Sequence, residues 1–260
     1  MGASENLLKL GLLPQRVANL SRRVSEAITI GLLDKQSMAD YIERVYSTHL
    51  DFYNPNHYQL DFEDAIFPFI AKFHDKGELL DAFCGQGREA RFFAERGFNV
   101  TGIDGSVGMI EGAKKYAQEA GFKARFEVAN CLQYESLKKY DVIYTSPWMY
   151  STFNDPQDRI RMIKYYSNAL KPNGILVISY KRFKYAAKKR EKFYYKISTF
   201  IALITANQWQ PRYGDFLLKK LFYHYFIPNE LESELEAAHL KIVCKEESKT
   251  GYLDFCILVA

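Results

Sequence analysis

The spacing of hydrophobic positions changes along the chain. Between residues 78 and 180, short apolar runs alternate with stretches whose apolar residues recur at helical spacing. The runs predict five strands, at 78–83, 99–103, 124–128, 140–145 and 175–180. The stretches between them predict helices at 88–96, 106–120 and 155–170. Strands that alternate with helices indicate βαβ units, and therefore an α/β domain with a parallel sheet.

The chain on either side of this region has a different pattern. Helical spacing recurs at 5–35, 37–46 and 62–73, which predicts a helical N-terminal cap or arm over residues 1–75. Residues 181–226 are basic and aromatic without a clear period, so we expect an irregular insertion there. The main domain is then predicted to cover residues 76–260.

The C-terminal part predicts how the sheet ends. Residues 228–238 have helical spacing, and two apolar strands follow at 241–245 and 252–259. The connection between these strands is too short for a crossover helix, so they must be antiparallel neighbours. One strand of the final hairpin therefore runs against the rest of the sheet.

Composition and charge narrow the possible functions. Of the 260 residues, 48% are hydrophobic, enough for a large core, and the net charge of +4 does not by itself indicate a nucleic-acid partner. The four cysteines form no C-x-x-C pair and have no histidine at metal spacing, so we predict reduced thiols, no metal site and a cytoplasmic location. No run approaches the roughly 20 apolar residues of a transmembrane segment.

Two glycines follow the first predicted strand. Residues 80–88 read LDAFCGQGR, and Asp104 ends the second strand. Residues 85–90 also match G-x-G-x-x-A, the loop of dinucleotide-binding folds. However, Asp81 precedes the glycines where it can accept from an amine, and a dinucleotide fold needs no reversed hairpin. The pattern therefore favours a different nucleoside ligand.

Taken together, the motifs resemble those of class I S-adenosylmethionine-dependent methyltransferases. The matching segments are LDAFCGQGR at 80–88, VTGIDGS at 100–106, Asn130-Cys131, YDVI at 140–143 and LKPNGIL at 170–176. The resemblance implies a Rossmann-like, seven-stranded, mostly parallel sheet with helices on both faces and a reversed C-terminal strand. It also implies S-adenosylmethionine as the cofactor.

The resemblance assigns roles to individual residues. Gly85 and Gly87 let the backbone approach the cofactor, and Asp104 accepts from both ribose hydroxyls. Asp81 holds the methionine ammonium, while Asn130 faces the adenine. The full set predicted to bind the cofactor is Asp81, Ala82, Phe83, Gly85, Gly87, Asp104, Gly105, Ser106, Met109, Asn130, Cys131 and Thr145.

The methyl acceptor is expected at the end of the fourth strand. Residues 144–150 read YTSPWMY, and ligands of α/β sheets bind at the carboxyl ends of strands. The residues predicted to face the acceptor are Ser146, Trp148, Tyr150, Tyr180 and His224. Trp148 either stacks on a flat acceptor or closes the pocket. A base is needed only if the acceptor arrives protonated, and His224 and Tyr150 are the candidates for that role.

These observations predict a methyltransferase that moves a methyl group to nitrogen or oxygen of a small molecule by in-line displacement. Two alternatives stay open. The first is an RNA (tRNA) methyltransferase that uses the basic and aromatic stretch 181–196. The second is a non-catalytic partner subunit that binds the cofactor. The sequence leaves the oligomeric state open.

Overall fold

The computed structural model describes residues 13–32, 55, 61–183, 189–207, 210–218, 221–248 and 254–260. The helix predicted at 37–46 lies outside these residues. The chain folds into two compact units. One comprises residues 1–42 and 185–222, and the other comprises residues 43–184 and 223–260.

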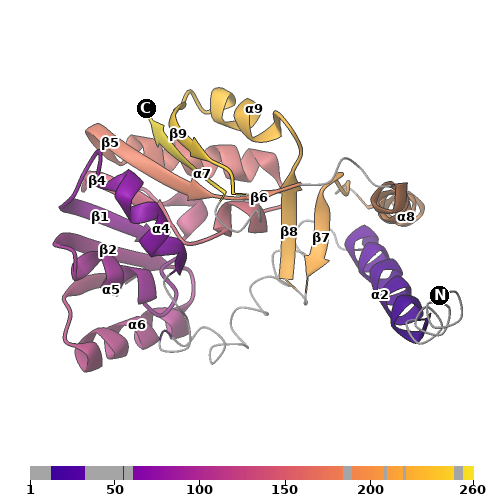
Figure 1. Cartoon of the computed structure of the whole chain (residues 1–260), viewed down its shortest axis with the longest axis horizontal. Coiled ribbons are helices and arrows are strands. Elements are labelled where there is room, and N and C mark those ends of the chain that lie inside the picture. The colour runs from indigo at the N-terminus through magenta and orange to yellow at the C-terminus, as the bar shows by residue number, and fades with distance from the viewer. Residues whose placement is uncertain are drawn as a thin grey trace, which may run out of the picture. The chain divides into compact units, whose positions relative to one another are not determined.

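The larger unit contains a seven-stranded sheet (Figure 1). Its strands are β1 (Gly77–Ala82), β2 (Phe98–Asp104), β3 (Ala124–Val128), β4 (Tyr140–Thr145), β5 (Leu170–Ser179), β9 (Lys241–Glu246) and β10 (Phe255–Val259). Their order is β3-β2-β1-β4-β5-β10-β9. The pairs from β3 to β5 are parallel, whereas β10 is antiparallel to both β5 and β9. The predicted sheet with a reversed C-terminal strand is therefore confirmed.

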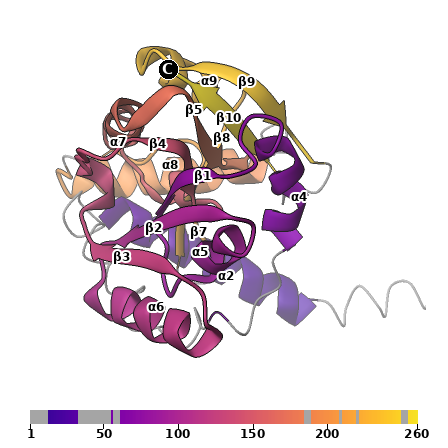
Figure 2. The ribbon, with the colours of Figure 1, turned by 90° about the vertical axis from the view of Figure 1, so that its left-hand side faces the viewer.

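Helices cover both faces of this sheet. The helices of the larger unit are α4 (Asp61–Ile70), α5 (Arg88–Ala94), α6 (Val107–Ala120), η3 (Cys131–Gln133), η4 (Met149–Thr152), α7 (Pro156–Asn168) and α9 (Glu230–Ala237). Apolar residues of α4, α5 and α6 form one core cluster with the sheet, and those of α7 and α9 form a second. Figure 2 shows α5 and α6 beside β1, β2 and β3, which they contact.

Local sequence explains where several elements begin. Asp155 caps α7 by accepting from the backbone N–H of Gln157 at 2.8 Å, and Pro156 occupies the first helical position. Strand β5 begins earlier than the predicted 175, because it already pairs with β4 at Leu170. Asn173 accommodates the resulting irregularity with a φ of 65°.

The smaller unit contains α2 (Leu13–Leu32), α8 (Lys189–Ile204) and β7 (Asp215–Leu218). Helices α2 and α8 pack on each other (Figure 1), and Arg23 Nη2 lies 2.8 Å from Glu191 Oε2 between them. A Cβ on Gly31 would lie only 2.5 Å from the Ser198 carbonyl oxygen, so the helices approach closely there. The helical prediction for the N-terminal stretch is thus confirmed over α2.

The prediction of an irregular insertion at 181–226 is wrong. The described part of this segment contains α8, β7 and the strands β6 (Lys181–Arg182) and β8 (Leu221–Phe226). Strand β6 pairs in parallel with the end of β8 through Lys181 with Tyr225 and Arg182 with Phe226. The pairing partner lies more than 40 residues away, so a local pattern could not reveal it.

Two expectations concern environment. All four cysteines are free thiols. Within the described part of the chain, no helix has the length and apolar character needed to cross a membrane. The cytoplasmic location stays a prediction.

Candidate active site

The loop after β1 has an unusual backbone. Phe83, Gly85 and Gly87 have φ values of 62°, 51° and 85°, in the left-handed region that disfavours side chains. A Cβ on Gly87 would lie 3.1 Å from Phe126 Cζ, whereas one on Gly85 would meet nothing within 4 Å. Glycine is therefore required at 87 by conformation and space, and at 85 by conformation alone.

The Asp104 carboxylate ties this loop to the next one. Its Oδ2 accepts from the backbone N–H of Gly85 at 3.1 Å, and its Oδ1 accepts from that of Ser106 at 2.9 Å. Burial raises the pKa of Asp104, and the two hydrogen bonds oppose that rise. Each oxygen keeps a lone pair for one further donor. Asp104 can therefore hold both loops and accept from two adjacent hydroxyls.

The predicted residues beyond Asp104 fall into two groups. Ser106 caps α6 by accepting from the Met109 backbone N–H at 3.3 Å, and Gly105 beside it is exposed. Asn130 is exposed next to the end of β3, where its Oδ1 accepts from the Leu132 N–H at 3.0 Å.

Cys131 and Met109 are both buried, with exposures of 4% and 3%. The Cys131 thiol donates to the Ile103 carbonyl at 3.7 Å, and burial raises its pKa to about 12. Cys131 is thus a core residue of this structure.

Asp81 lies in a buried acidic cluster that sequence analysis only partly detected. Its carboxylate is fully buried, and neither oxygen has a hydrogen-bond partner among the described residues. Burial, followed by the neighbouring Glu89 and Glu63, raises its pKa well above the usual range. Arg88 counters this charge, since its Nη2 contacts Glu89 and lies 3.3 Å from Glu63 Oε1. Glu63 is one of three acids in the first turn of α4, beside Asp61 and Asp64, so the local sequence does not single it out.

The segment after β4 is bound to the ends of two neighbouring strands. The Thr145 hydroxyl donates to the Val177 carbonyl at 3.2 Å. Ser146 Oγ donates to the carbonyl of Phe83 at 2.8 Å. The Trp148 backbone N–H donates to Ser179 Oγ at 2.6 Å, with a φ of 64° at Trp148. Ser146 therefore lies against the glycine loop, and Trp148 lies beside the end of β5.

Two predicted acceptor residues point into the core instead. The Tyr150 hydroxyl is fully buried and donates to Glu234 Oε2 at 2.8 Å. Arg159, also fully buried, donates to the same carboxylate through Nε at 2.9 Å. His224 is fully buried, with Nε2 3.0 Å from Glu230 Oε2. These contacts give Tyr150 and His224 structural roles at α9 and do not favour either as a base.

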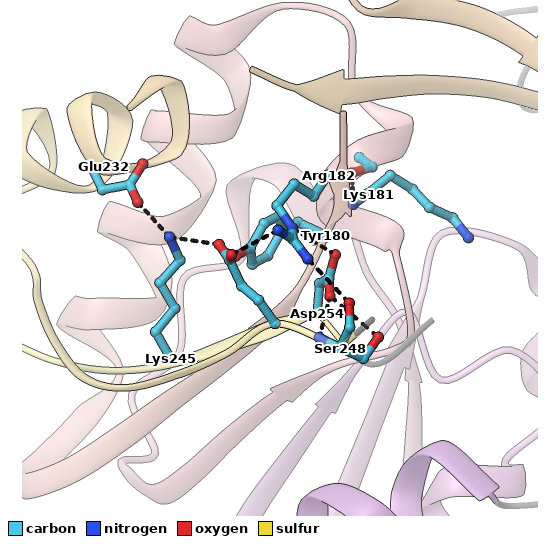
Figure 3. A network of polar contacts seen from close by, with 9 residues as sticks. Tyr180, Lys181, Arg182, Glu232, Lys245, Ser248 and Asp254 are labelled. Carbon is cyan, nitrogen blue, oxygen red and sulfur yellow. Dashed lines mark hydrogen bonds and ion pairs between the residues drawn. The ribbon is translucent and has the colours of Figure 1, made fainter. Parts of the chain in front are cut away.

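Tyr180 belongs to a polar network at the carboxyl ends of β5 and β9 (Figure 3). Its hydroxyl donates to Glu247 Oε1 at 3.1 Å, and Arg182 pairs with Glu247 at 2.9 Å and with Asp254 at 3.2 Å. Lys245 joins Glu247 to Glu232. Tyr180 and Arg182 line a pocket of about 660 Å³. The neighbouring Lys181 points away from this network (Figure 3).

The basic stretch 181–196 is only partly described, because residues 184–188 lie outside the described ranges. Within it, Arg182 is neutralised by two carboxylates, and Glu191 pairs with Arg23. Tyr194 is buried, and the Arg23 guanidinium lies 5.3 Å from the centre of its ring. Arg182 and Tyr194 thus pack within the protein, whereas Lys192, Phe193 and Lys196 on α8 are exposed.

The sheet order, the reversed β10 and the glycine loop define a Rossmann-like methyltransferase fold. A family model described as a methyltransferase domain matches residues 73–230, more than half of the 260-residue chain. The chain therefore belongs to this methyltransferase family, as the sequence motifs predicted. Neither the RNA-methyltransferase alternative nor the non-catalytic alternative is favoured by the comparisons.

Individual relatives agree with this assignment. A ubiquinone biosynthesis O-methyltransferase of Rickettsia conorii is 34% identical over 116 residues, which are 45% of this chain and 39% of that protein. The chain thus matches about two fifths of that relative's length. The structure of an S-adenosylmethionine-dependent methyltransferase from Methanosarcina mazei is similar with a TM-score of 0.56 and 25% identity, covering 74% of this chain and 95% of that one. A magnesium protoporphyrin IX methyltransferase from Synechocystis with bound S-adenosylhomocysteine has a TM-score of 0.52, 17% identity, and coverage of 76% and 80%.

Proposed function

We propose that this protein transfers a methyl group from S-adenosylmethionine to an oxygen atom of a small-molecule acceptor. The observation that carries the proposal is the Asp104 carboxylate, which joins two loops through Gly85 and Ser106 and keeps lone pairs for two hydroxyls. The choice of oxygen is supported by the relative from Rickettsia conorii, whose name describes an O-methyltransferase.

The residues at the ends of β1 and β2 fit this cofactor. A side chain at Gly87 would be strained by the positive φ and would crowd Phe126, and the open space around Gly85 suits a close ligand. Asp104 accepts from the ribose hydroxyls in this proposal. The buried and unpartnered Asp81 carboxylate suits a cation, and the methionine ammonium would supply one. When bound, S-adenosylmethionine supplies a methyl group on a positively charged sulfur.

The protein's contribution to the chemistry is mainly placement. The segment after β4 is fixed to the glycine loop through Ser146 and to β5 through Trp148, so it holds the acceptor side rigidly against the cofactor side. Such positioning brings reacting atoms to about 3–3.5 Å and supplies much of the rate enhancement of a displacement reaction. A protonated oxygen acceptor additionally needs a group that takes its proton.

Isothermal titration calorimetry with S-adenosylmethionine tests the cofactor assignment. We expect wild-type protein to bind, Asp104→Ala to bind at least about tenfold more weakly, and the exposed control Asp75→Ala to bind like wild type. A 2′-deoxyribose analogue of the cofactor should lose affinity for wild type and not for Asp104→Ala. Equal affinity of wild type for both compounds would contradict the role of Asp104, and absence of binding to wild type would exclude the proposed function.

A further inference from the structure

Lys181 begins β6, two residues after the end of β5, and its side chain lies against the segment after β4. Its Nζ lies 3.6 Å from the centre of the Trp148 ring and 5.5 Å from that of Tyr223. Its backbone N–H donates to Ser151 Oγ at 2.7 Å, which fixes the start of the side chain. The amine is thus placed between two aromatic rings, beside the strand ends where the acceptor is expected.

Burial destabilises the charged form of Lys181. No carboxylate among the described residues lies within ion-pairing distance of its Nζ, and burial lowers its pKa to about 8. Asp254 is the one described acid whose field opposes this effect, and its carboxylate is already held by Arg182 at 3.2 Å and by the Ser248 N–H at 2.8 Å. The titratable neighbour Tyr223 has its own pKa raised to about 12 by burial, so it is neutral at pH 7.

We propose that the Lys181 amine is the general base of this enzyme and that the acceptor is a planar molecule with an acidic hydroxyl, a phenol or an enol. This proposal rests on the proposed function. The rings of Trp148 and Tyr223 flank the amine, and a flat acceptor ring packed beside them would bring its hydroxyl close to Nζ. They also stabilise the ammonium as it forms, because a cation gains energy over an aromatic face. Lysines in such apolar settings are suited to general-base chemistry.

The proton transfer limits the chemical class of the acceptor, because its hydroxyl must be acidic enough to give its proton to Lys181. A phenolic hydroxyl has a pKa of about 10, within about two pH units of this amine, so its proton can move to Nζ. An aliphatic hydroxyl is as weak an acid as water, far weaker than a phenol, so this amine cannot take its proton. In the reaction, the acceptor O–H proton passes to the neutral Nζ as the oxygen forms a bond to the methyl carbon. The carbon–sulfur bond breaks, and its electron pair stays on sulfur as a neutral thioether. Lys181 later releases the proton to solvent.

A coloured phenol tests the proposal without requiring turnover. We expect 4-nitrocatechol added to wild-type protein saturated with S-adenosylhomocysteine to show the phenolate absorbance at a pH one unit below the pKa of the free probe. Lys181→Met should abolish this shift, and the same substitution at the exposed Lys115 should preserve it. Calorimetry with S-adenosylhomocysteine should give equal affinity in all three proteins. Absence of bound phenolate in wild type, or its persistence in Lys181→Met, overturns the proposal and leaves the cofactor assignment standing.

Measurements of turnover distinguish a general base at position 181 from a side chain that supplies only a fixed positive charge. Lys181→Arg keeps a cation that does not lose its proton near neutral pH. We therefore expect kcat/KM for unsubstituted catechol, whose hydroxyls are still protonated near neutral pH, to fall at least about 100-fold with a smaller change in KM. The pH profile of wild-type kcat/KM should rise with its midpoint near pH 8 and level off at higher pH. Undiminished turnover by Lys181→Arg, or no methylation of catechol by wild type, overturns the assignment of Lys181 as a base acting on a phenol.

Discussion

The two ends of the proposed site are built in different ways. We call the ends of β1 and β2 the cofactor end and the ends of β4 and β5 the acceptor end, after the roles proposed for them. At the cofactor end, Asp104 holds Gly85 only 19 positions away, and backbone conformation shapes the loop. At the acceptor end, Tyr150 meets Glu234 across 84 positions and Arg182 meets Asp254 across 72. The first end depends on a short stretch of sequence, whereas the second depends on the whole chain folding correctly.

The largest effect should come from the ion pair that supports the acceptor end. Glu234→Gln leaves the fully buried Arg159 without a carboxylate, and breaking such a pair costs about 3–5 kcal/mol. We expect Tm to fall by about 10 °C or more in thermal unfolding followed by circular dichroism. The exposed Glu236 on the same helix provides the control Glu236→Gln, which should unfold like wild type. Equal Tm values in both variants would mean that distant contacts do not hold this end together.

A smaller effect should distinguish structure from catalysis at Tyr150. Tyr150→Phe removes a hydrogen bond of 2.8 Å to the Glu234 carboxylate, and bonds to charged groups are worth about 1.5–3 kcal/mol. We expect lower stability in guanidinium unfolding and little change in kcat for a methylated acceptor. A 100-fold loss of kcat with unchanged stability would instead restore Tyr150 as the base.

The cofactor end should show a pH dependence of its own. Burial raises the pKa of Glu63 to about 8, so the folded protein holds a proton there that the unfolded chain releases near pH 4.5. The stability from Glu63 is therefore complete below about pH 4.5 and is lost as pH rises through 8. Glu63→Gln mimics the protonated acid and should become more stable than wild type at pH 9, by about 2 kcal/mol. Unfolding at pH 5, 7 and 9 measures this, with the exposed Glu111→Gln as control. A constant difference across this range would refute the raised pKa.

The smallest effect should separate two requirements for glycine in the glycine loop, namely space for the backbone and a positive φ. Gly87 and Gly97 have similar φ values of 85° and 92°, but only at Gly87 would a Cβ meet another residue. Each alanine variant should lose about 1 kcal/mol of stability. Only Gly87→Ala should also lose affinity for S-adenosylmethionine, by about tenfold in calorimetry. Equal losses of affinity in the two variants would mean that cofactor binding does not depend on the space around Gly87.

The same contrast explains what the sequence could predict. The strands from β1 to β4 and the reversed hairpin follow from local periodicity and from the short connection at the hairpin, and all are confirmed. The glycine loop was recognisable because positive φ requires glycine at particular spacings. His224 and Tyr150 were chosen by chemical type alone, and their burial depends on helix α9. In the sequence, Lys181 is only one of many basic residues. The two aromatic side chains that surround its amine, Trp148 and Tyr223, are distant from it in sequence, so no local pattern marks it.

The close crossing of α2 and α8 has a consequence for how this protein can be shortened. Gly31 admits the Ser198 carbonyl, and Arg23 pairs with Glu191, so two segments separated by 168 positions complete one another. Removing residues 185–222 alone would leave the buried Ala27 and Ile30 of the N-terminal helix without their covering partner. A shortened variant that keeps only the larger unit should therefore lack both segments.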